Sequence, residues 1–258
     1  MKEFFFRKMS GAGNDFIIVD ARNQDFRASS QLISKLSNRH IIGCDQFVVI
    51  NNSHRADCFM EIYNSDGSSS GMCGNATRCV ASIIMREKSL EQITIETSSK
   101  ILKCWKVGYQ IAVEMGIPIF ANTHFFFEDL KFIYVDMGNP HAVCMVNNIP
   151  DDETFNRIGK NVESHKFFPK KTNVEFAKII SDQIIEVRVF ERGVGETLAC
   201  GSGACAVAAA AIKYKLIKNN NILIRFRGGD LKIIWPNEGS QIVMIGEYKE
   251  IFTGNFKN

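Results

Sequence analysis

The pattern of apolar and polar positions predicts many short strands interrupted by a few helices. Runs of β-branched and aromatic residues bounded by Gly, Asn and Asp are typical of strands. In the first half of the chain such runs occupy residues 16–20, 46–50, 57–63, 92–97, 101–107 and 110–115. In the second half they occupy residues 132–136, 173–180, 184–190, 222–227, 231–235 and 241–245. Segments 30–39 and 154–164 carry apolar residues at helical spacing and are predicted to be polar, one-sided helices.

Two further helices are predicted at residues 74–87 and 201–215, and both are apolar on nearly every side. The second runs from Ala204 to Ile212 without a charged residue. A helix that is apolar all round must be buried on all sides. We therefore expect a curved sheet to wrap around each of these helices.

The two halves of the chain resemble each other in sequence. Cys73-Gly74-Asn75-Ala76-Thr77-Arg78-Cys79 returns 127 residues later as Cys200-Gly201-Ser202-Gly203-Ala204-Cys205. At the same offset Gln46-Phe47-Val48-Val49 aligns with Asn173-Val174-Glu175-Phe176, and Ile62-Tyr63-Asn64 aligns with Val189-Phe190-Glu191. Slightly out of register, Gly13-Asn14-Asp15-Phe16 aligns with Gly138-Asn139-Pro140-His141. Aligned blocks in the same order indicate a tandem duplication.

The duplication predicts an α+β fold of two pseudo-symmetric domains, each a curved, mostly antiparallel sheet around a buried central helix. We place the domains at residues 1–117 and 118–258, with the segment 116–131 as the connection and the last strand able to return to the first half. The first domain carries Cys73 and the second carries Cys200.

Composition and charge favour a small-molecule function. The 258 residues are 45% hydrophobic and 23% charged, and the net charge is +3, which is ordinary for a folded globular protein. The basic residues are scattered, so neither a nucleic-acid nor a membrane partner is expected. Glu3 and Arg7 interrupt the apolar residues at the N-terminus, so no secretory signal is expected there, and the longest apolar run, 198–212, is too short to span a membrane. The expected compartment is the cytoplasm.

Eight cysteines in such a chain are expected to be reduced thiols. No two of them have the Cys-x-x-Cys spacing of a redox motif or zinc site, so no bound metal is expected.

The strongest chemical signal is Cys-Gly at the predicted start of both buried helices. A helix N-terminus carries unpaired N–H groups and partial positive charge, so it binds anions and favours a thiolate. A bound carboxylate would place its α-carbon between two thiols aimed at one point in the cleft between the halves. That arrangement suits removal of an α-proton on one face and its replacement on the other, with the enediolate-like charge stabilised by preorganised donors.

Several of these residues also have simpler interpretations. Cys79 and Cys205 lie inside the apolar helices and are expected to be packing residues. His141 follows Gly138-Asn139-Pro140 and is either a buried structural histidine or a site residue. Arg192 is either a surface partner of Glu191 or a carboxylate clamp. Residues 201–206 match a dinucleotide-binding pattern only formally, because no strand ends directly before them.

A set of motifs resembles the diaminopimelate epimerase family over nearly the whole chain. It comprises Ser10-Gly11-Ala12-Gly13-Asn14-Asp15-Phe16, Gly43-Cys44-Asp45-Gln46, Asn64-x-Asp66-Gly67, Met72 to Cys79, Met137-Gly138-Asn139-Pro140-His141 and Glu191 to Gly203. Proline racemases and phenazine-type isomerases share the implied fold but lack the full set. The loop Ser68-Ser69-Ser70-Gly71 departs from the acidic and bulky residues usual before Met-Cys-Gly.

The resemblance implies an isomerase that works without pyridoxal phosphate or another cofactor and interconverts LL- and meso-diaminopimelate for lysine and peptidoglycan biosynthesis. Cys73 and Cys200 are then the catalytic acid and base, and Gly74, Asn75, Gly201 and Ser202 bind the reacting carboxylate. His141 supports the site. The rest of the substrate is held by Asn14, Gln46, Asn64, Asn139, Asn173, Glu191 and Arg192. A homodimer is a further expectation that the sequence leaves open.

Three other functions remain open from the residues alone. The same chemistry would racemise another amino acid, since it requires only an α-carboxylate. Cys200 activated by His141 would serve a hydrolase or transferase, but this leaves Cys73 unexplained. A non-catalytic anion-binding module would use only the helix termini and would tolerate loss of both cysteines.

Overall fold

The computed structural model describes residues 3–121 and 124–257. The chain divides into two compact units, one formed by residues 1–113 with 246–258 and the other by residues 114–245. Within the described residues no helix is both long and apolar enough to cross a bilayer.

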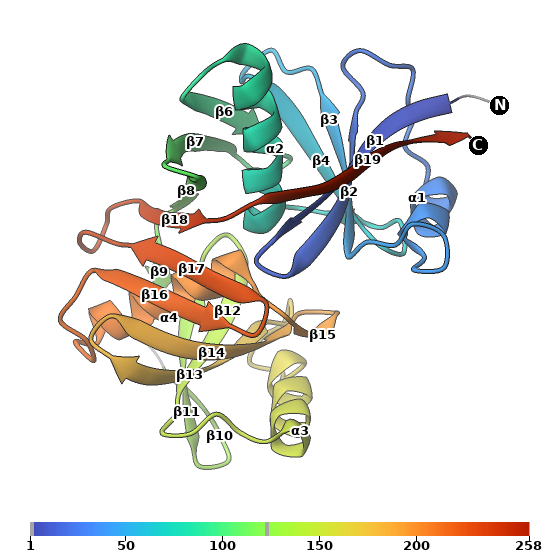
Figure 1. Cartoon of the computed structure of the whole chain (residues 1–258). Coiled ribbons are helices and arrows are strands. Elements are labelled where there is room, and N and C mark those ends of the chain that lie inside the picture. The colour runs from blue at the N-terminus through green and yellow to red at the C-terminus, as the bar shows by residue number, and fades with distance from the viewer. Residues whose placement is uncertain (1–2, 122–123, 258) are drawn as a thin grey trace. The chain divides into compact units, whose positions relative to one another are not determined.

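The first unit is a curved sheet with two helices (Figure 1). Its helices are α1 (Ser30–Ser37) and α2 (Gly74–Lys88). Its strands are β1 (Glu3–Gly11), β2 (Asn14–Asp20), β3 (Gln46–Asn51), β4 (Cys58–Asn64), β5 (Ser69–Ser70), β6 (Gln92–Glu96), β7 (Ile101–Val107), most of β8 (Gln110–Gly116) and β19 (Lys249–Lys257).

Strand pairing in the first unit joins the two ends of the chain. β19 lies antiparallel to β1, from Glu3 opposite Lys257 to Ser10 opposite Lys249, as Figure 1 shows. β1 pairs antiparallel with β2, β2 is parallel to β3, and β3 is antiparallel to β4. β4 is then parallel to β6, which begins the antiparallel series β6–β7–β8.

The second unit repeats this plan. Its helices are α3 (Asp152–Glu163) and α4 (Gly201–Lys213). Its strands are β9 (Ile119–Phe120), β10 (Phe125–Phe127), β11 (Leu130–Asp136), β12 (Pro140–Met145), β13 (Asn173–Ser181), β14 (Ile184–Glu191), β15 (Gly195–Thr197), β16 (Asn221–Phe226), β17 (Gly229–Ile234) and β18 (Ile242–Gly246).

Strand registers match between the units. Phe16 pairs with Gln46 in the parallel β2–β3 ladder, and His141 pairs with Asn173 in the parallel β12–β13 ladder. α2 begins at Gly74 and α4 at Gly201, which preserves the offset of 127 residues found in the sequence. The predicted duplication and α+β fold are confirmed.

The long helix of each unit lies inside its sheet. In α2 the residues from Gly74 to Met85 are all buried, and in α4 those from Gly201 to Ala211 are all buried. α1 and α3 show only one buried stripe, formed in α3 by Phe155, Ile158 and Val162. The pattern of apolar residues therefore predicted correctly which helices are central and which lie outside.

The sequence-based prediction missed several strands. β1, β12 and β19 were not expected, and neither were the short β5 and β15. The segment 116–131, expected to be only a connection, contains β9 and β10 and the start of β11, while residues 122–123 lie outside the described residues. These strands alternate weakly or contain Gly and Pro, so that long-range pairing rather than local pattern makes them strands.

Candidate active site

Both cysteines of the Cys-Gly pairs occupy the N-cap of a buried helix. Cys73 caps α2 with φ −137° and ψ 112°, and Cys200 caps α4 with φ −131° and ψ 119°. This extended backbone is typical of N-caps and directs the next N–H groups outward from the helix end. Cys73 is partly exposed, whereas Cys200 is buried. Gly74 and Gly201, the first residues of the helices, are buried directly behind them.

In the first unit the predicted amide residues form two bonded pairs, one of them at the start of the helix that Cys73 caps. Asn75, in the first turn of α2, donates from Nδ2 to Oδ1 of Asn14 at 3.1 Å. Gln46 and Asn64 are opposite each other in the β3–β4 register, and Nε2 of Gln46 lies 3.4 Å from Oδ1 of Asn64. Gln46 also reaches Oγ of Ser70 at 3.5 Å.

Two buried amide oxygens in these pairs remain unsatisfied. Oε1 of Gln46 and Oδ1 of Asn75 have no hydrogen-bond partner among the described residues. Leaving a buried acceptor without a donor costs about 1–3 kcal/mol. Such oxygens are suited to accept hydrogen bonds from a ligand, and an ammonium group is a strong donor.

In the second unit a continuous set of contacts leads away from Cys200. Its Sγ accepts from the backbone N–H of Gly203 at 3.4 Å and lies 3.5 Å from Oγ of Ser202. Nδ2 of Asn139 donates to Oγ of Ser202 at 3.4 Å, and Oδ1 of Asn139 lies 3.2 Å from Nε2 of His141. His141 is fully buried. Predicted residues from β12 and α4 are therefore brought together here.

Two carboxyl groups also lie beside Cys200. Glu175 is fully buried on β13, and its Oε1 is 2.6 Å from Nδ1 of His141. Glu191, at the end of β14, is partly exposed as a residue, yet burial of its carboxyl raises its pKa. The hydroxyl of Thr197 donates to Glu191, which also contacts the Cys200 side chain.

The surroundings of Cys200 correct the expectation that a helix terminus makes this cysteine a thiolate. The pKa of Cys200 is raised well above its ordinary value by burial first, and then by the charges of Glu191 and Glu175. The N–H of Gly203 and the Ser202 hydroxyl act in the opposite direction but are weaker. Cys200 therefore holds its proton at neutral pH.

Asn173 and Arg192 occupy one corner of the second unit. The buried Asn173 donates from Nδ2 to the carbonyl of Pro140 at 2.9 Å, and its Oδ1 accepts from the backbone N–H of Arg192 at 3.0 Å. Both ends of this amide therefore link the start of β12 to the end of β14. The exposed Arg192 side chain donates to the carbonyl of Lys170 at 3.3 Å.

Sequence analysis missed Glu175, Thr197 and Ser70, which contact predicted residues. Glu175 has a recognisable signal in the sequence, because it is a charged residue within the apolar strand run 173–180. Cys79 and Cys205 are fully buried, as expected of packing residues, and burial raises the pKa of Cys79 to about 12. No group of three or more His, Cys, Asp or Glu suited to a metal occurs in the part of the chain that is described.

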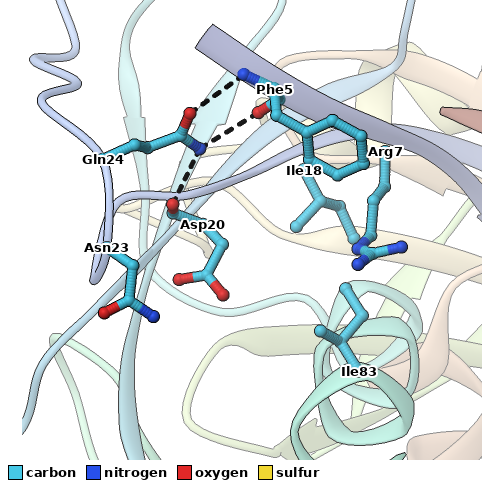
Figure 2. A pocket seen from close by; sticks show the side chains of 7 residues that line it. All are labelled: Phe5, Arg7, Ile18, Asp20, Asn23, Gln24 and Ile83. Carbon is cyan, nitrogen blue, oxygen red and sulfur yellow. Dashed lines mark hydrogen bonds between the residues drawn. The ribbon is translucent and has the colours of Figure 1, made fainter. Parts of the chain in front are cut away.

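Two hollows of the described surface lie away from these residues. In the first unit one of about 250 Å³ is lined by Phe5, Arg7, Ile18, Asp20, Asn23, Gln24 and Ile83 (Figure 2). There the Gln24 amide bonds to the backbone of Phe5 and to the carbonyl of Asp20. In the second unit a hollow of about 450 Å³ lies beside Arg188, Arg225 and Arg227. None of the predicted site residues lines either hollow.

Comparisons with known proteins agree with the repeated plan. The model of the diaminopimelate epimerase family matches residues 6–121 and again residues 133–251. A diaminopimelate epimerase of Pelagibacter ubique is 39% identical, with 97% of each chain covered. One from Methanococcus maripaludis (strain C5) is 37% identical over 96% of this chain and 98% of its own.

Solved structures share the fold at low identity. A predicted epimerase from Pseudomonas aeruginosa has a TM-score of 0.77 at 13% identity, with 99% of both chains covered. A hydroxyproline epimerase from Agrobacterium vitis has a TM-score of 0.73 at 12% identity, covering 98% of this chain and 92% of its own. These structures show the fold alone. With the family model matching both halves, and with relatives of nearly 40% identity over the full length, the chain belongs to the diaminopimelate epimerase family.

Proposed function

We propose that this member of the diaminopimelate epimerase family interconverts LL- and meso-diaminopimelate by moving the α-proton, with Cys73 and Cys200 as its two acid-base groups. The activity follows from the family and from the full-length relatives that bear this name. The observation that carries the residue assignment is the same N-cap cysteine, followed by a buried glycine, at the start of the central helix of both units. Packing alone gives no reason to repeat a cysteine at this position.

The proposed reaction transfers one proton at a time. One cysteine, as its thiolate, takes the α-proton and becomes a thiol, leaving a planar carbanion whose charge spreads onto the carboxylate. The other cysteine, as a thiol, protonates the opposite face and becomes a thiolate. N–H groups at the starts of α2 and α4 stabilise the carboxylate as its negative charge grows. Two thiols and these donors supply base, acid and charge stabilisation, so the proposal includes no cofactor.

The state of Cys200 fits one part of this cycle. Burial, Glu191 and Glu175 raise its pKa, so that it enters the cycle as the thiol that donates a proton. An acid of high pKa holds its proton until a strongly basic carbanion forms beside it.

The remaining predicted residues are proposed to hold the two ends of the substrate. The unsatisfied oxygens of Gln46 and Asn75 suit an ammonium group, and the exposed guanidinium of Arg192 suits a carboxylate. Asn14, Asn64, Asn139, Asn173, Glu191, Ser202 and the backbone of Gly74 and Gly201 complete the proposed set, and His141 supports it. Asn173 does so by joining the loops, because its amide is already bonded at both ends. A cytoplasmic location and a homodimer also stay predictions.

The number of bases is tested by incubation in deuterium oxide without added cofactor. If two thiols serve opposite faces, product formed early carries deuterium at the inverted carbon, because its hydrogen comes from a thiol equilibrated with solvent. Unreacted substrate stays protonated. Mass spectrometry at low conversion, with each stereoisomer as the starting material, measures the deuterium content of the product and of the unreacted substrate. Product that keeps the substrate's protium, or substrate that exchanges as fast as product forms, would point to a single base.

A further inference from the structure

The buried carboxyl group of Glu175 has no role in the reaction as proposed so far. Its side chain and that of His141 are both fully inaccessible, and the two meet at 2.6 Å between Oε1 and Nδ1. Oε2 of Glu175 has no hydrogen-bond partner among the described residues. Removing a carboxyl group from water is costly unless it is paired and hydrogen-bonded.

The fold itself does not require a charge at this position. By the matched strand registers, His141, Glu175 and Gly203 of the second unit correspond to Phe16, Val48 and Ala76 of the first. All three of the latter are apolar and fully buried. The same sheet and helix therefore pack well without any polar group here. The second unit alone carries a histidine, a glutamate and a glycine together.

The glycine makes room for the glutamate. A Cβ on Gly203 would lie 2.8 Å from Oε1 of Glu175 and 3.2 Å from Cβ of Cys200. The absence of a side chain in the first turn of α4 thus allows the carboxyl group to reach His141 next to Cys200. The three positions form one structural unit.

This unit connects to the cysteine through hydrogen-bonding groups. From His141 the contacts continue through Nε2 to Asn139, from Asn139 to Ser202, and from Ser202 to Sγ of Cys200, at 3.2, 3.4 and 3.5 Å in turn. Both ring nitrogens of His141 face oxygen acceptors, so Nδ1–H donates to the Glu175 carboxylate and Nε2–H to the Asn139 amide, which holds the ring in one orientation. The orientations of the Asn139, Ser202 and Cys200 side chains then depend on the orientation of this ring.

We propose that Glu175 is a positioning residue for the epimerisation: its carboxylate accepts the Nδ1–H of His141 and holds the imidazole so that Nε2–H donates to Oδ1 of Asn139, at the start of the Asn139–Ser202–Cys200 contacts. Glu175 touches no reacting atom in this assignment. It acts through His141 and keeps these side chains aligned during the proton transfer at Cys200. The kinetic part of this inference rests on the proposed function, whereas the hydrogen bond to His141 does not.

The kinetic test compares two substitutions of Glu175. Glu175→Gln keeps an oxygen that accepts from Nδ1–H, and Glu175→Val places there the residue found at the equivalent position of the first unit. Loss of the hydrogen-bond partner that orients a metal-bound histidine typically costs about 10–100-fold in activity, and we take the same range for His141. We expect Glu175→Val to lose about that much in kcat with little change in KM, and Glu175→Gln to recover most of it. Equal kcat in Glu175→Val and wild type, or equal loss in both variants, would overturn the proposal.

A second test reads the imidazole directly and needs no activity. In protein labelled with ¹⁵N at histidine, the resonances of His141, identified by their loss in His141→Gln, should show a protonated Nδ1 in wild type and Glu175→Gln but not in Glu175→Val. Phe176→Leu is the matched control. It changes a buried residue next along β13 whose side chain faces the opposite side of the sheet, so it should lower stability and leave these resonances and kcat unchanged.

The two tests separate the possible failures. An Nδ1 without a proton in the wild-type protein would overturn the positioning role whatever the activity. If the wild-type protein showed the expected Nδ1–H but did not epimerise diaminopimelate, the proposed function would fail and the hydrogen bond would stand. Unfolding curves for all variants show whether a lost signal reflects a lost fold.

Discussion

The two N-cap cysteines lie in different chemical surroundings although they occupy equivalent positions. Cys73 is partly exposed, while Cys200 is buried beside Glu175 and Glu191. A helix N-terminus stabilises a charge by up to about 2 kcal/mol. Full burial can shift a pKa by up to about 3–5 units, at about 1.4 kcal/mol per unit. Burial is therefore the larger effect, which explains why Cys200 holds its proton.

At the scale of single residues we predict that Cys73→Ala and Cys200→Ala each remove nearly all epimerisation. An acid-base group typically contributes about 10²–10⁴-fold to a rate, and each direction of the reaction needs both groups. The measurement is kcat in both directions with stereoisomers resolved. Cys79→Ala and Cys205→Ala are matched controls inside the same helices, expected to change stability more than kcat. Turnover close to wild type in either of the first two variants would exclude the pair.

At the scale of elements the first turn of α4 differs from that of α2 in one revealing way. The third residue after the cysteine is Gly203 in α4 and Ala76 in α2. Alanine is the better helix former by about 1 kcal/mol, so the glycine weakens the helix. The glycine stands at a position where a Cβ would lie 2.8 Å from the Glu175 carboxyl group. The space that this carboxyl group needs therefore explains why the helix has glycine here.

We therefore predict that Gly203→Ala lowers kcat while leaving the protein folded. The new methyl group must displace the carboxyl of Glu175 or the side chain of Cys200, and a misplacement of about 1 Å can cost about 10²-fold in rate. Steady-state kinetics and urea unfolding measure the two effects.

Gly159→Ala in α3 is the comparison for this test. There the Cβ would meet the Phe190 ring at 2.8 Å, so the variant should lose stability, by about 1–3 kcal/mol, more than kcat. A Gly203→Ala enzyme with unchanged kcat would show that the space is not needed for activity.

At the scale of the whole molecule, most thiols are buried and their burial makes stability depend on pH. Burial raises the pKa of Cys58, Cys79 and Cys144 to about 12 from an ordinary value of 9.0. In the unfolded chain these thiols ionise above pH 9, but in the folded chain they do not until about pH 12. Ionisation then lowers the free energy of the unfolded state but not that of the folded state. The free energy of unfolding therefore falls as the pH rises above 9.

We predict that each of these thiols costs about 1.4 kcal/mol of stability at pH 10 relative to pH 8, since the pH is then about one unit above the pKa of the unfolded thiol. Urea unfolding under reducing conditions at both pH values measures the loss. Cys144→Ala is the sharpest variant, because burial is the cause of the shift at Cys144. It should lose less stability than wild type between the two pH values, whatever it costs at pH 8. Identical losses in both proteins would contradict the raised pKa.

Much of the fold follows from local patterns of residues. Helices 74–88 and 201–213 could be located because each is a largely apolar run that begins at Gly and ends at Lys within one segment. The duplication could be seen because the spacing between Cys73 and Cys200 equals that between Gln46 and Asn173. β1 and β19 could not be located in this way, and they pair with each other from opposite ends of the chain. No local pattern records that pairing.

The same difference between local pattern and long-range contact separates the residues of the candidate site. The cysteines and glycines could be proposed from the sequence by itself, since a helix start and its Cys-Gly pair are adjacent in the chain, whereas the amide residues followed only from the resemblance to the family. The place of Glu175 in the site could be recognised only from the tertiary structure. It meets His141, 34 residues away, because β12 and β13 run parallel in one register, and it meets the first turn of α4 because Gly203 has no side chain. The protonation of Cys200 also depends on the tertiary structure. The position of this cysteine at a helix start can be read from the local sequence, whereas its burial and the neighbouring carboxylates arise only when distant segments pack together.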